Sequence, residues 1–323
     1  MNLTALIDGL HSSRGVQHKR DIAAVVQDLG LSGDSSIAVG DDCAAIPDGE
    51  GWNLLAMEGF QPEFVACDPW FAGWCAVMVN LADVYAMGGR PTALVNALWS
   101  GDAPSCRQML AGMAAAAQTY RVPIVGGHSN TRAEAPYLAA AILGRARRLL
   151  TSFDARPGDA LVVAIDLRGA YRKPFPHWNC TEQAPAERLR GDLELLPQLA
   201  ESGRCRAAKD ISQAGVLGTL LMLLEGSGVG AVVQPAAVPR PPEVEARAWL
   251  LSTFPSYGFC LAVTPQHVAA VIDTFQQRDL ACAVIGHCDA TRRLTLVHGE
   301  QRLPAWDLRE SPLTGCTRGA IHA

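Results

Sequence analysis

A small set of acidic and amide side chains stands at the ends of apolar segments, where a folded chain presents loops. The set comprises Asp41, Asp42, Glu58, Asn80, Asp83 and Asp210. Oxygen ligands of this kind suit Mg²⁺, which is usually held by a few carboxylates together with the phosphates of a substrate. The pattern indicates a metal and nucleotide site assembled from several loops.

Asn80 and Asp83 are three residues apart in a stretch that reads as helix, so they share one face. Apolar residues surround them in the sequence. The pair is either the solvated edge of that helix or two ligands presented to a cleft, and both interpretations stay open. Asp41 and Asp42 are similarly either a turn or two like charges kept together by a cation.

Asp210 and Ser212 follow a short apolar run and precede a helix expected over 213–225. Ser212 is expected to be the N-cap of that helix. The alternative puts Asp210 on a metal ion, with Ser212 and the neighbouring amides facing phosphate oxygens.

Two glycines, Gly126 and Gly127, end a strand and are followed by His128. Glycines allow a ligand to approach the backbone closely, although a tight turn uses them too. His128 is a candidate acid, base or substrate contact. A basic group near the N-terminus that includes Lys19 is either a clamp for polyphosphate or a solvated helix start.

Several other kinds of site are excluded by pattern. The chain has no GxxxxGK[ST], no GxGxxG and no GxSxG, so a P-loop, a dinucleotide fingerprint and a hydrolase nucleophile elbow are absent. The 10 cysteines form no CxxC pair and lie mostly in apolar runs, which favours reduced, buried thiols over zinc.

The elements that must position these residues alternate between helix and strand, which predicts an α/β or α+β fold in two lobes. Helices are expected over 17–29, 69–87, 104–120, 192–202, 213–225 and 266–278. Strands are expected over 36–39, 53–57, 91–99, 122–125, 137–143, 160–165, 205–208, 259–263, 282–286 and 293–297. Proline and glycine near residue 157 predict a boundary between a domain over 1–150 and one over 151–323. The aromatic and proline-rich stretch over 168–185 is a structural loop or covers a ligand.

Composition sets the remaining limits. Of 323 residues 49% are hydrophobic and 18% charged, which is typical of globular proteins and excludes disorder. A net charge of -5 argues against a nucleic-acid partner. No apolar run approaches the roughly 20 residues that span a bilayer, and no basic leader precedes an apolar stretch. We therefore expect a cytoplasmic protein with no membrane partner.

Taken in chain order, six segments resemble the AIR synthase-like (PurM-like) superfamily, which includes thiamine-monophosphate kinase and selenophosphate synthetase. They are the segments over 40–46 (GDDCAAI), 68–74 (DPWFAGW), 79–91 (VNLADVYAMGGRP), 126–129 (GGHS) and 210–215 (DISQAG) with 226–230 (GSGVG). The third is similar to the family's NxxDxxAMGxxP. The likeness runs from about residue 35 to 290 and is nearest to AIR synthase-related proteins of unassigned activity.

The resemblance implies an N-terminal lobe that contributes to a dimeric β-barrel, a C-terminal α/β sandwich lobe, and a homodimer. It also implies that Mg-ATP is bound by acidic loops. On the matching positions Asp42, Asp83 and Asp210 become metal ligands, with Glu58 where an Asp is typical. Asp41 and Asn80 become supporting ligands, and Gly126, Gly127 and Ser212, which lie in matching segments, are further candidate nucleotide contacts. Lys19 lies outside the matching segments and is a candidate phosphate contact on its charge alone.

Three positions depart from the kinase pattern. Glu58 stands for Asp, His128 for the Asp of GGDT, and Gln213 for the second Asp of DxSD. The metal set of thiamine-monophosphate kinase is therefore incomplete here. We expect an ATP- and Mg²⁺-dependent enzyme, a kinase-like transferase or synthase, that phosphorylates or phosphate-activates a small polar metabolite, with His128 and Asp210 as catalytic candidates. The alternative is a nucleotide-binding regulatory module without turnover.

Overall fold

The computed structural model describes residues 1–31 and 37–317. The chain divides into two compact units. The first contains residues 1–41, 150–183 and 198–323, and the second contains residues 42–149 and 184–197. The expected boundary at residue 150 is one of the junctions between them, but residues 1–41 belong with the C-terminal half. The reason is that Leu3, Leu6 and Leu10 pack into the core of the first unit.

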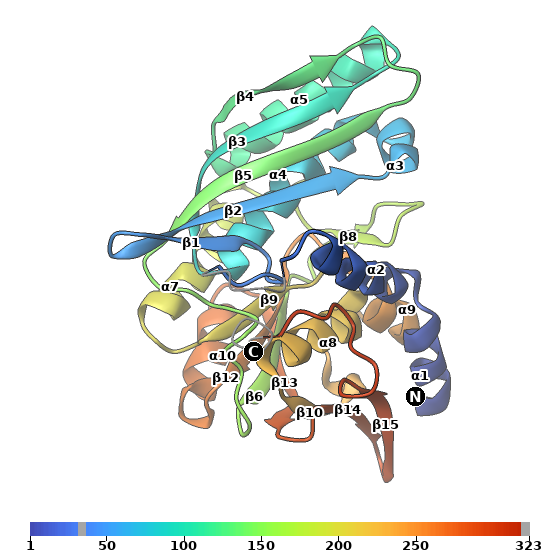
Figure 1. Ribbon diagram of the computed structural model, residues 1–323, viewed down its shortest axis with the longest axis vertical. Coiled ribbons are helices and arrows are strands. Elements are labelled where there is room, and N and C mark those ends of the chain that lie inside the picture. The colour runs from blue at the N-terminus through green and yellow to red at the C-terminus, as the bar shows by residue number, and fades with distance from the viewer. Residues whose placement is uncertain (32–36, 318–323) are drawn as a thin grey trace. The chain divides into compact units, whose positions relative to one another are not determined.

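The second unit is a five-stranded sheet with helices on one face (Figure 1). The strand order is β1 (Ala44–Asp48), β2 (Gly51–Phe60), β5 (Tyr137–Ala146), β3 (Arg90–Trp99) and β4 (Ile124–Asn130). All neighbours are antiparallel except β3 and β4, which are parallel and joined through α5 (Ala103–Tyr120). Helices α3 (Pro62–Cys67), α4 (Pro69–Ala86) and α6 (Ala186–Leu193) complete this unit.

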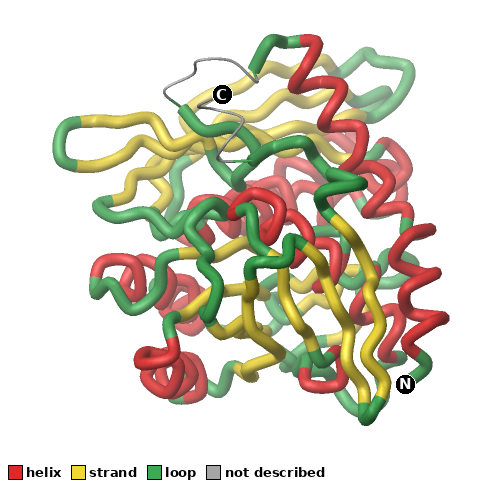
Figure 2. The backbone as a smooth tube through the Cα atoms, turned by 60° about the horizontal axis from the view of Figure 1, so that its bottom comes forward, coloured by secondary structure: helices red, strands yellow, loops and turns green. Residues whose placement is uncertain are grey.

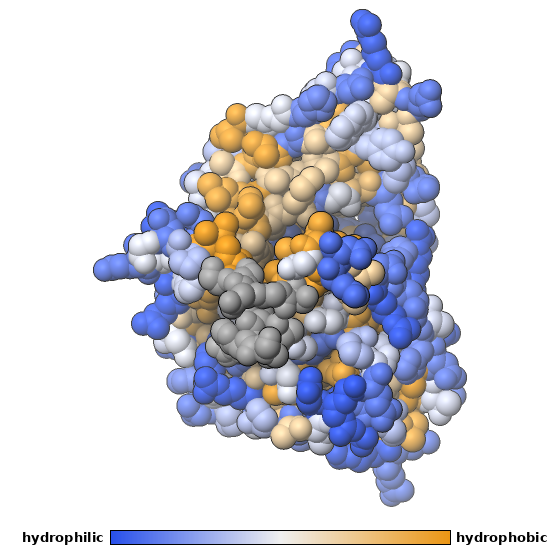
Figure 3. Space-filling view, viewed as in Figure 1, coloured by the Kyte–Doolittle hydropathy of each residue, from blue (hydrophilic) through white to orange (hydrophobic). Residues whose placement is uncertain are grey.

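The strands β2 and β5 alternate between buried and exposed residues, as a sheet covered on one face must. Leu54 and Ile142 are fully buried, and α4 packs against both of their strands. The opposite face is also apolar: Leu55 and Met57 are 47% and 67% exposed. Figure 3 shows hydrophobic side chains gathered over these strands. In the single chain this face is therefore an exposed apolar surface.

Helix α4 is apolar on nearly every side and is buried between α5 and the sheet. Its backbone comes very close to that of α5: a Cβ atom at Gly73 would collide with the carbonyl of Met109, and one at Gly112 with the carbonyl of Trp70. Glycine at both positions permits this close crossing of the two helices, which fixes the position of the residues that α4 carries.

The first unit is built on a seven-stranded sheet. Its order is β15 (Gln301–Asp307), β14 (Arg293–His298), β10 (Gly230–Val233), β13 (Ala281–Asp289), β6 (Ala160–Ile165), β12 (Gly258–Val263) and β9 (Ala207–Asp210). Its helices are α1 (Leu3–Ser12), α2 (Arg14–Asp28), α8 (Gly215–Ser227), α9 (Ala246–Leu251) and α10 (Val268–Gln276), with short 3-10 turns η1 (Pro235–Ala237) and η2 (Pro265–His267). A further helix, α7 (Leu195–Glu201), begins in the second unit and ends in the first. Figures 1 and 2 both place the β14–β15 hairpin beside α1.

Most of the expected elements are confirmed within a few residues, and the strand expected over 160–165 coincides with β6. The strand expected over 36–39 is wrong for residues 37–39, which lie in a loop, while Ser36 lies outside the described residues. The sequence did not predict helices α1, α3 and α9, most of α6, or strands β1, β10 and β15. They are short segments or segments without a clear period. Distant segments stabilise α1 and β10, whereas β1 and β15 each form a hairpin with the neighbouring strand.

The aromatic stretch over 168–185 forms a small sheet of β7 (Ala170–Tyr171), β8 (His177–Asn179) and β11 (Phe254–Pro255). Trp178 is buried and packs edge-on against Trp249. These contacts favour the interpretation of this stretch as a structural loop with buried rings.

The 10 cysteines are all free, and only Cys67 is exposed. Burial raises the pKa of the Cys282 and Cys288 thiols to about 12. They are therefore neutral, unreactive thiols, as expected. Among the described residues, none of the helices is long and apolar enough to cross a membrane.

His177 makes the stability of the first unit depend on pH. Burial, aided by the charge of Arg172, lowers its pKa from 6.5 to about 3. Its Nε2 lies 2.9 Å from the hydroxyl of Ser256. As the pH falls below 6.5, the unfolded chain binds a proton that the folded chain excludes, so the free energy of unfolding decreases.

We expect H177N to be less stable than the parent near neutral pH, because the buried hydrogen bond is altered, and to lose less stability between pH 6.5 and pH 4. Urea unfolding at stepped pH measures both effects. The exposed H18N is the control and should follow the parent. Parallel pH curves for H177N and the parent would contradict this account.

Candidate functional site

Two of the predicted metal ligands meet in the second unit. Asp83 lies in the last turns of α4, and Asp42 lies in the bend just before β1. Carboxylate oxygens of the two residues lie within 4.8 Å of each other. Asp83 is only 6% exposed. Two carboxylates so close together, one of them buried, repel each other, and a bound cation relieves that repulsion.

Asn80 lies one turn before Asp83 on the same face of α4 and is fully buried. Its Nδ2 donates to the carbonyl of Ala76 at 2.9 Å, while its Oδ1 has no hydrogen-bond partner among the described residues. The alternative that Asn80 and Asp83 form a solvated helix edge is therefore wrong. A buried oxygen without a partner is costly, and such an oxygen in a native structure calls for a ligand or ion. The Asn80 oxygen and the two carboxylates fit a hard cation such as Mg²⁺.

Asp41, the neighbour of Asp42, is held inside the first unit. Its Oδ2 accepts a hydrogen bond from the backbone amide of Ser152 at 2.8 Å, and its Oδ1 accepts one from the Ser152 hydroxyl at 2.6 Å. The ammonium group of Lys209 lies 4.0 Å from the same carboxylate, and both side chains are buried. Asp41 thus anchors the loop that carries Asp42.

The C-terminal segment supports the same loop. Gly40 has a φ of +109°, and a Cβ atom there would collide with the side chain of Cys316. Cys316 is held in place because the buried carboxylate of Glu225 accepts hydrogen bonds from the amides of Leu313, Thr314 and Gly315 and from the Thr314 hydroxyl. Burial raises the pKa of the Cys316 thiol, so it acts as a packing group.

Asp210 ends β9 in the first unit, and Ser212 follows it. The expectation that Ser212 caps the next helix is wrong: α8 begins at Gly215, with Ala214 at the N-cap position. The Ser212 hydroxyl is buried and has no hydrogen-bond partner among the described residues. The alternative that Ser212 and its neighbouring amides face phosphate oxygens stays a prediction.

Gly126, Gly127 and His128 lie on β4, an exposed edge strand, and not at a turn. A Cβ atom at Gly127 would collide with Asn96 on β3, so strand packing already requires this glycine. The ring of His128 lies 5.7 Å from that of Trp99, and His128 is outside the acidic group described above. The structure thus gives His128 no contact with the two carboxylates.

Two other candidates lie outside that group. Glu58 is on β2, partly buried on the face that Leu54 and Ala56 share, and opposite Ala140. Lys19 belongs to the ordered helix α2, and its neighbour Arg20 donates to the hydroxyl of Ser311 at 3.2 Å. The helical part of the second interpretation, a solvated helix start, is thus confirmed for this segment, and the clamp for polyphosphate stays a prediction.

Sequence reasoning missed the part that Ser152 and Lys209 play in holding Asp41. Lys209 offered one signal: it is one of only three lysines in the chain and stands in an apolar run directly before Asp210. Ser152 offered none, because it is separated from Asp41 by the whole second unit.

Comparison with known proteins agrees with this arrangement of motifs. Residues 40–146 match the model for the AIR synthase related protein, N-terminal domain, and residues 176–299 match that for its C-terminal domain. An uncharacterized protein of Synechocystis is 47% identical over 98% of this chain and 99% of its own length. A selenide, water dikinase of Myxococcus xanthus is 28% identical over 76% of this chain and 68% of its own.

The fold is also that of a solved structure, T. maritima PurL complexed with ATP. The TM-score is 0.69, with 21% identity over 81% of this chain and 45% of PurL. This likeness shows a shared fold. With both domain models matched and a relative of nearly equal length at 47% identity, the chain belongs to the AIR synthase related protein family, with its two-domain α/β architecture.

Proposed function

We propose that this protein is an ATP- and Mg²⁺-dependent enzyme that phosphorylates or phosphate-activates a small polar metabolite, as thiamine-monophosphate kinase and AIR synthase do. The observation that carries the proposal is the proximity of the Asp42 and Asp83 carboxylates, together with the unpartnered Oδ1 of Asn80 one turn earlier on α4. Three hard oxygen ligands in a largely buried setting are the chemistry that a magnesium–nucleotide complex requires.

Asp210 is the third carboxylate in the proposed ligand set, and Ser212 is a proposed nucleotide contact. Both belong to the DISQAG motif. Supporting this, the Ser212 hydroxyl lacks a partner, and Lys209, which precedes Asp210, lies 4.0 Å from the anchor residue Asp41. Glu58 is left out of this set because its carboxylate lies outside the acidic group.

Phosphoryl transfer depends mainly on positioning and on charge neutralisation. A magnesium ion, when bound, neutralises phosphate charge. In this proposal Asp42, Asp83 and Asp210 hold it, and Asn80 supports the arrangement. Asp41 holds the loop that carries Asp42 and does not bind the ion directly, because both of its oxygens accept hydrogen bonds from Ser152. His128 and Lys19 stay candidates for contacts with the substrate or the phosphates.

We also propose that the protein is a homodimer, paired through the outer face of the five-stranded sheet. Met57 and Val95 both lie opposite Ala141, on either side of β5, and Leu55 lies opposite Leu143. Leu55, Met57, Val95 and Leu143 are each at least 41% exposed in the single chain. Four large apolar residues on one flat face favour burial against a second copy.

The first test is calorimetric titration of ATP into the protein with and without Mg²⁺, followed by analysis of the recovered nucleotide. Magnesium-dependent binding with slow hydrolysis supports the enzyme. Binding that leaves ATP intact, even in the presence of candidate acceptors, would favour the alternative, a regulatory module without turnover. No binding in either condition would overturn the proposed site.

Asp83 provides the sharpest test of the metal ligands. D83N keeps the shape of the side chain but removes a charge that a cation needs, so magnesium-dependent ATP binding should weaken at least about tenfold. The same titration measures this effect. E134Q, which neutralises an exposed acid in the same unit, is the control and should bind as the parent does. Equal affinity for D83N and the parent would remove Asp83 from the site.

Asn80 gives a test with two opposite readouts. N80L replaces both terminal polar atoms of the side chain by methyl groups. It removes the cost of the unpartnered oxygen and also the hydrogen bond from Nδ2 to Ala76, whose carbonyl lies within the helix, so the nucleotide-free protein should gain stability, by about 1 kcal/mol. ATP affinity should fall, because a ligand oxygen is lost. Thermal unfolding measures the first effect and calorimetry the second. A variant that loses stability and keeps full ATP affinity would show that Asn80 has only a structural role.

The proposed dimer predicts that M57E produces monomers, because a charge would be buried in an apolar interface. Light scattering coupled to size-exclusion chromatography measures the molar mass at micromolar concentration. Q108E adds the same charge on the exposed surface of α5 and should leave the mass unchanged. A monomeric parent, or a dimeric M57E, would contradict the assignment of this face.

A further inference from the structure

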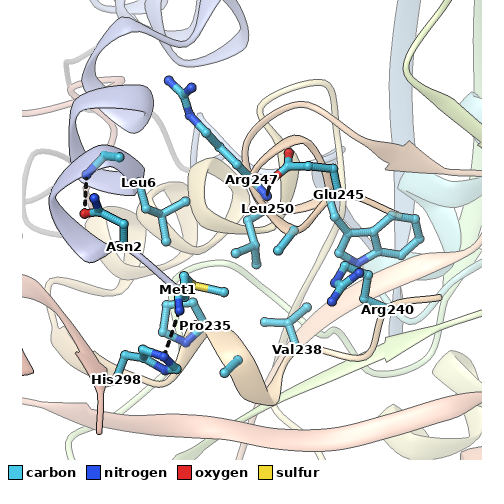
Figure 4. Close-up of a pocket in the computed structure, with 14 residues that line it drawn as sticks. Met1, Asn2, Leu6, Pro235, Val238, Arg240, Glu245, Arg247, Leu250 and His298 are labelled. Atoms are coloured by element: carbon cyan, nitrogen blue, oxygen red, sulfur yellow. Dashed lines mark hydrogen bonds between the residues drawn. The ribbon is translucent and has the colours of Figure 1, made fainter. Parts of the chain in front are cut away.

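A cavity in the first unit lies outside every motif considered so far. It has a volume of about 600 Å³, within the size range of small-molecule sites. Its walls come from the start of α1, the loop over 235–240, helix α9 and the end of β14 (Figure 4). None of the residues proposed to bind metal or nucleotide lines it.

The walls of the cavity are mainly apolar. Leu6 from α1, Leu250 from α9, and Pro235 and Val238 from the intervening loop surround it, and Figure 4 shows these four side chains directed toward one another. Each is buried, and Leu6, Leu250 and Val238 belong to the core of the unit. The walls are therefore rigid and able to hold an apolar group without rearrangement.

Arg240 supplies a fixed positive charge at this cavity. Its Nη1 donates to the carbonyl oxygens of Pro241, Pro242 and Val244, which holds the guanidinium group against its own loop. In the part of the chain that the structure describes, its Nε and Nη2 donate to no acceptor, and it forms no ion pair. Three N–H groups of a fixed guanidinium are thus available, with the geometry that binds a carboxylate through two parallel hydrogen bonds.

The other charged side chains around the cavity have structural tasks. Both carboxylate oxygens of Glu245 accept hydrogen bonds from the amides of Arg247 and Ala248, which cap α9. The guanidinium of Arg247 packs against α1 at Gly9, and in Figure 4 it points away from Leu250 and Val238. His298 Nε2 lies 2.9 Å from the backbone nitrogen of Met1. Arg240 is therefore the charge that this cavity offers to a ligand.

We propose that this cavity is a second binding site, for a small organic carboxylate with a compact apolar body. The carboxylate accepts hydrogen bonds from Nε and Nη2 of Arg240, and the apolar body lies against Leu6, Val238 and Leu250. The apolar walls favour the hydrocarbon part, and the fixed guanidinium group selects for the anion, since it need not be ordered on binding.

The test uses octanoate as the ligand and 8-anilinonaphthalene-1-sulfonate, an apolar anion that fluoresces in apolar surroundings, as the reporter. Octanoate should displace the reporter from the full-length protein with a single saturable transition. Octan-1-ol, which has the chain without the charge, should displace it at least about tenfold less well. Equal displacement by the alcohol, or no displacement by octanoate, would overturn the proposal.

Three variants assign the site. R240Q should weaken octanoate binding at least about tenfold, whereas R302Q, an exposed arginine on β15, should have no effect. Because R240Q also removes hydrogen bonds within the loop, A236W provides a second route: it fills the cavity from an exposed lining position and should abolish displacement. Loss of the signal in M57E alone would show that the reporter binds the sheet face, and would overturn the proposal.

Discussion

The burial of polar groups on helix α4 is the constraint on which the rest of the structure depends. This helix is enclosed by α5 and by the sheet, and it meets α5 at a distance that only glycine at Gly73 and Gly112 allows. Yet it carries Asn80 and Asp83 inside. Burying a carboxylate and an amide oxygen opposes folding unless hydrogen bonds or an ion replace the lost hydration. A helix packed this tightly cannot rotate them to water, so the site must satisfy them in place.

The motif residues divide into those that offer oxygen atoms and those that hold them in position. The carboxylates of Asp42 and Asp83 lie close together, whereas both oxygens of Asp41 accept hydrogen bonds from Ser152. The lack of a side chain at Gly40 leaves room for Cys316 to pack against it. The segment just before Cys316 is held by hydrogen bonds to the buried carboxylate of Glu225. The adjacent residues Asp41 and Asp42 therefore have different roles, although they are chemically identical.

Apolar surface is used in three ways in this chain. The core of the first unit buries it completely, the sheet of the second unit exposes it on one flat face, and the cavity beside Arg240 encloses it around a fixed charge. The flat face suits a large, rigid partner such as a second copy, because many residues lose water at once. The cavity suits a small molecule, because its walls curve around a limited volume.

Local patterns along the chain were enough to predict the alternation of helices and strands, the mixed α/β class, the family resemblance and the acidic motifs. These depend on local periodicity and on short spacings, such as the three residues between Asn80 and Asp83. Three outcomes required the folded chain: helices α1 and α2 belong with the C-terminal half, Ser212 is not a helix cap, and His128 lies on an exposed edge strand. The folded chain also revealed Ser152 and Lys209 as the partners of Asp41. The reason is physical: these outcomes depend on which distant surface buries each segment, and no local pattern records the partner.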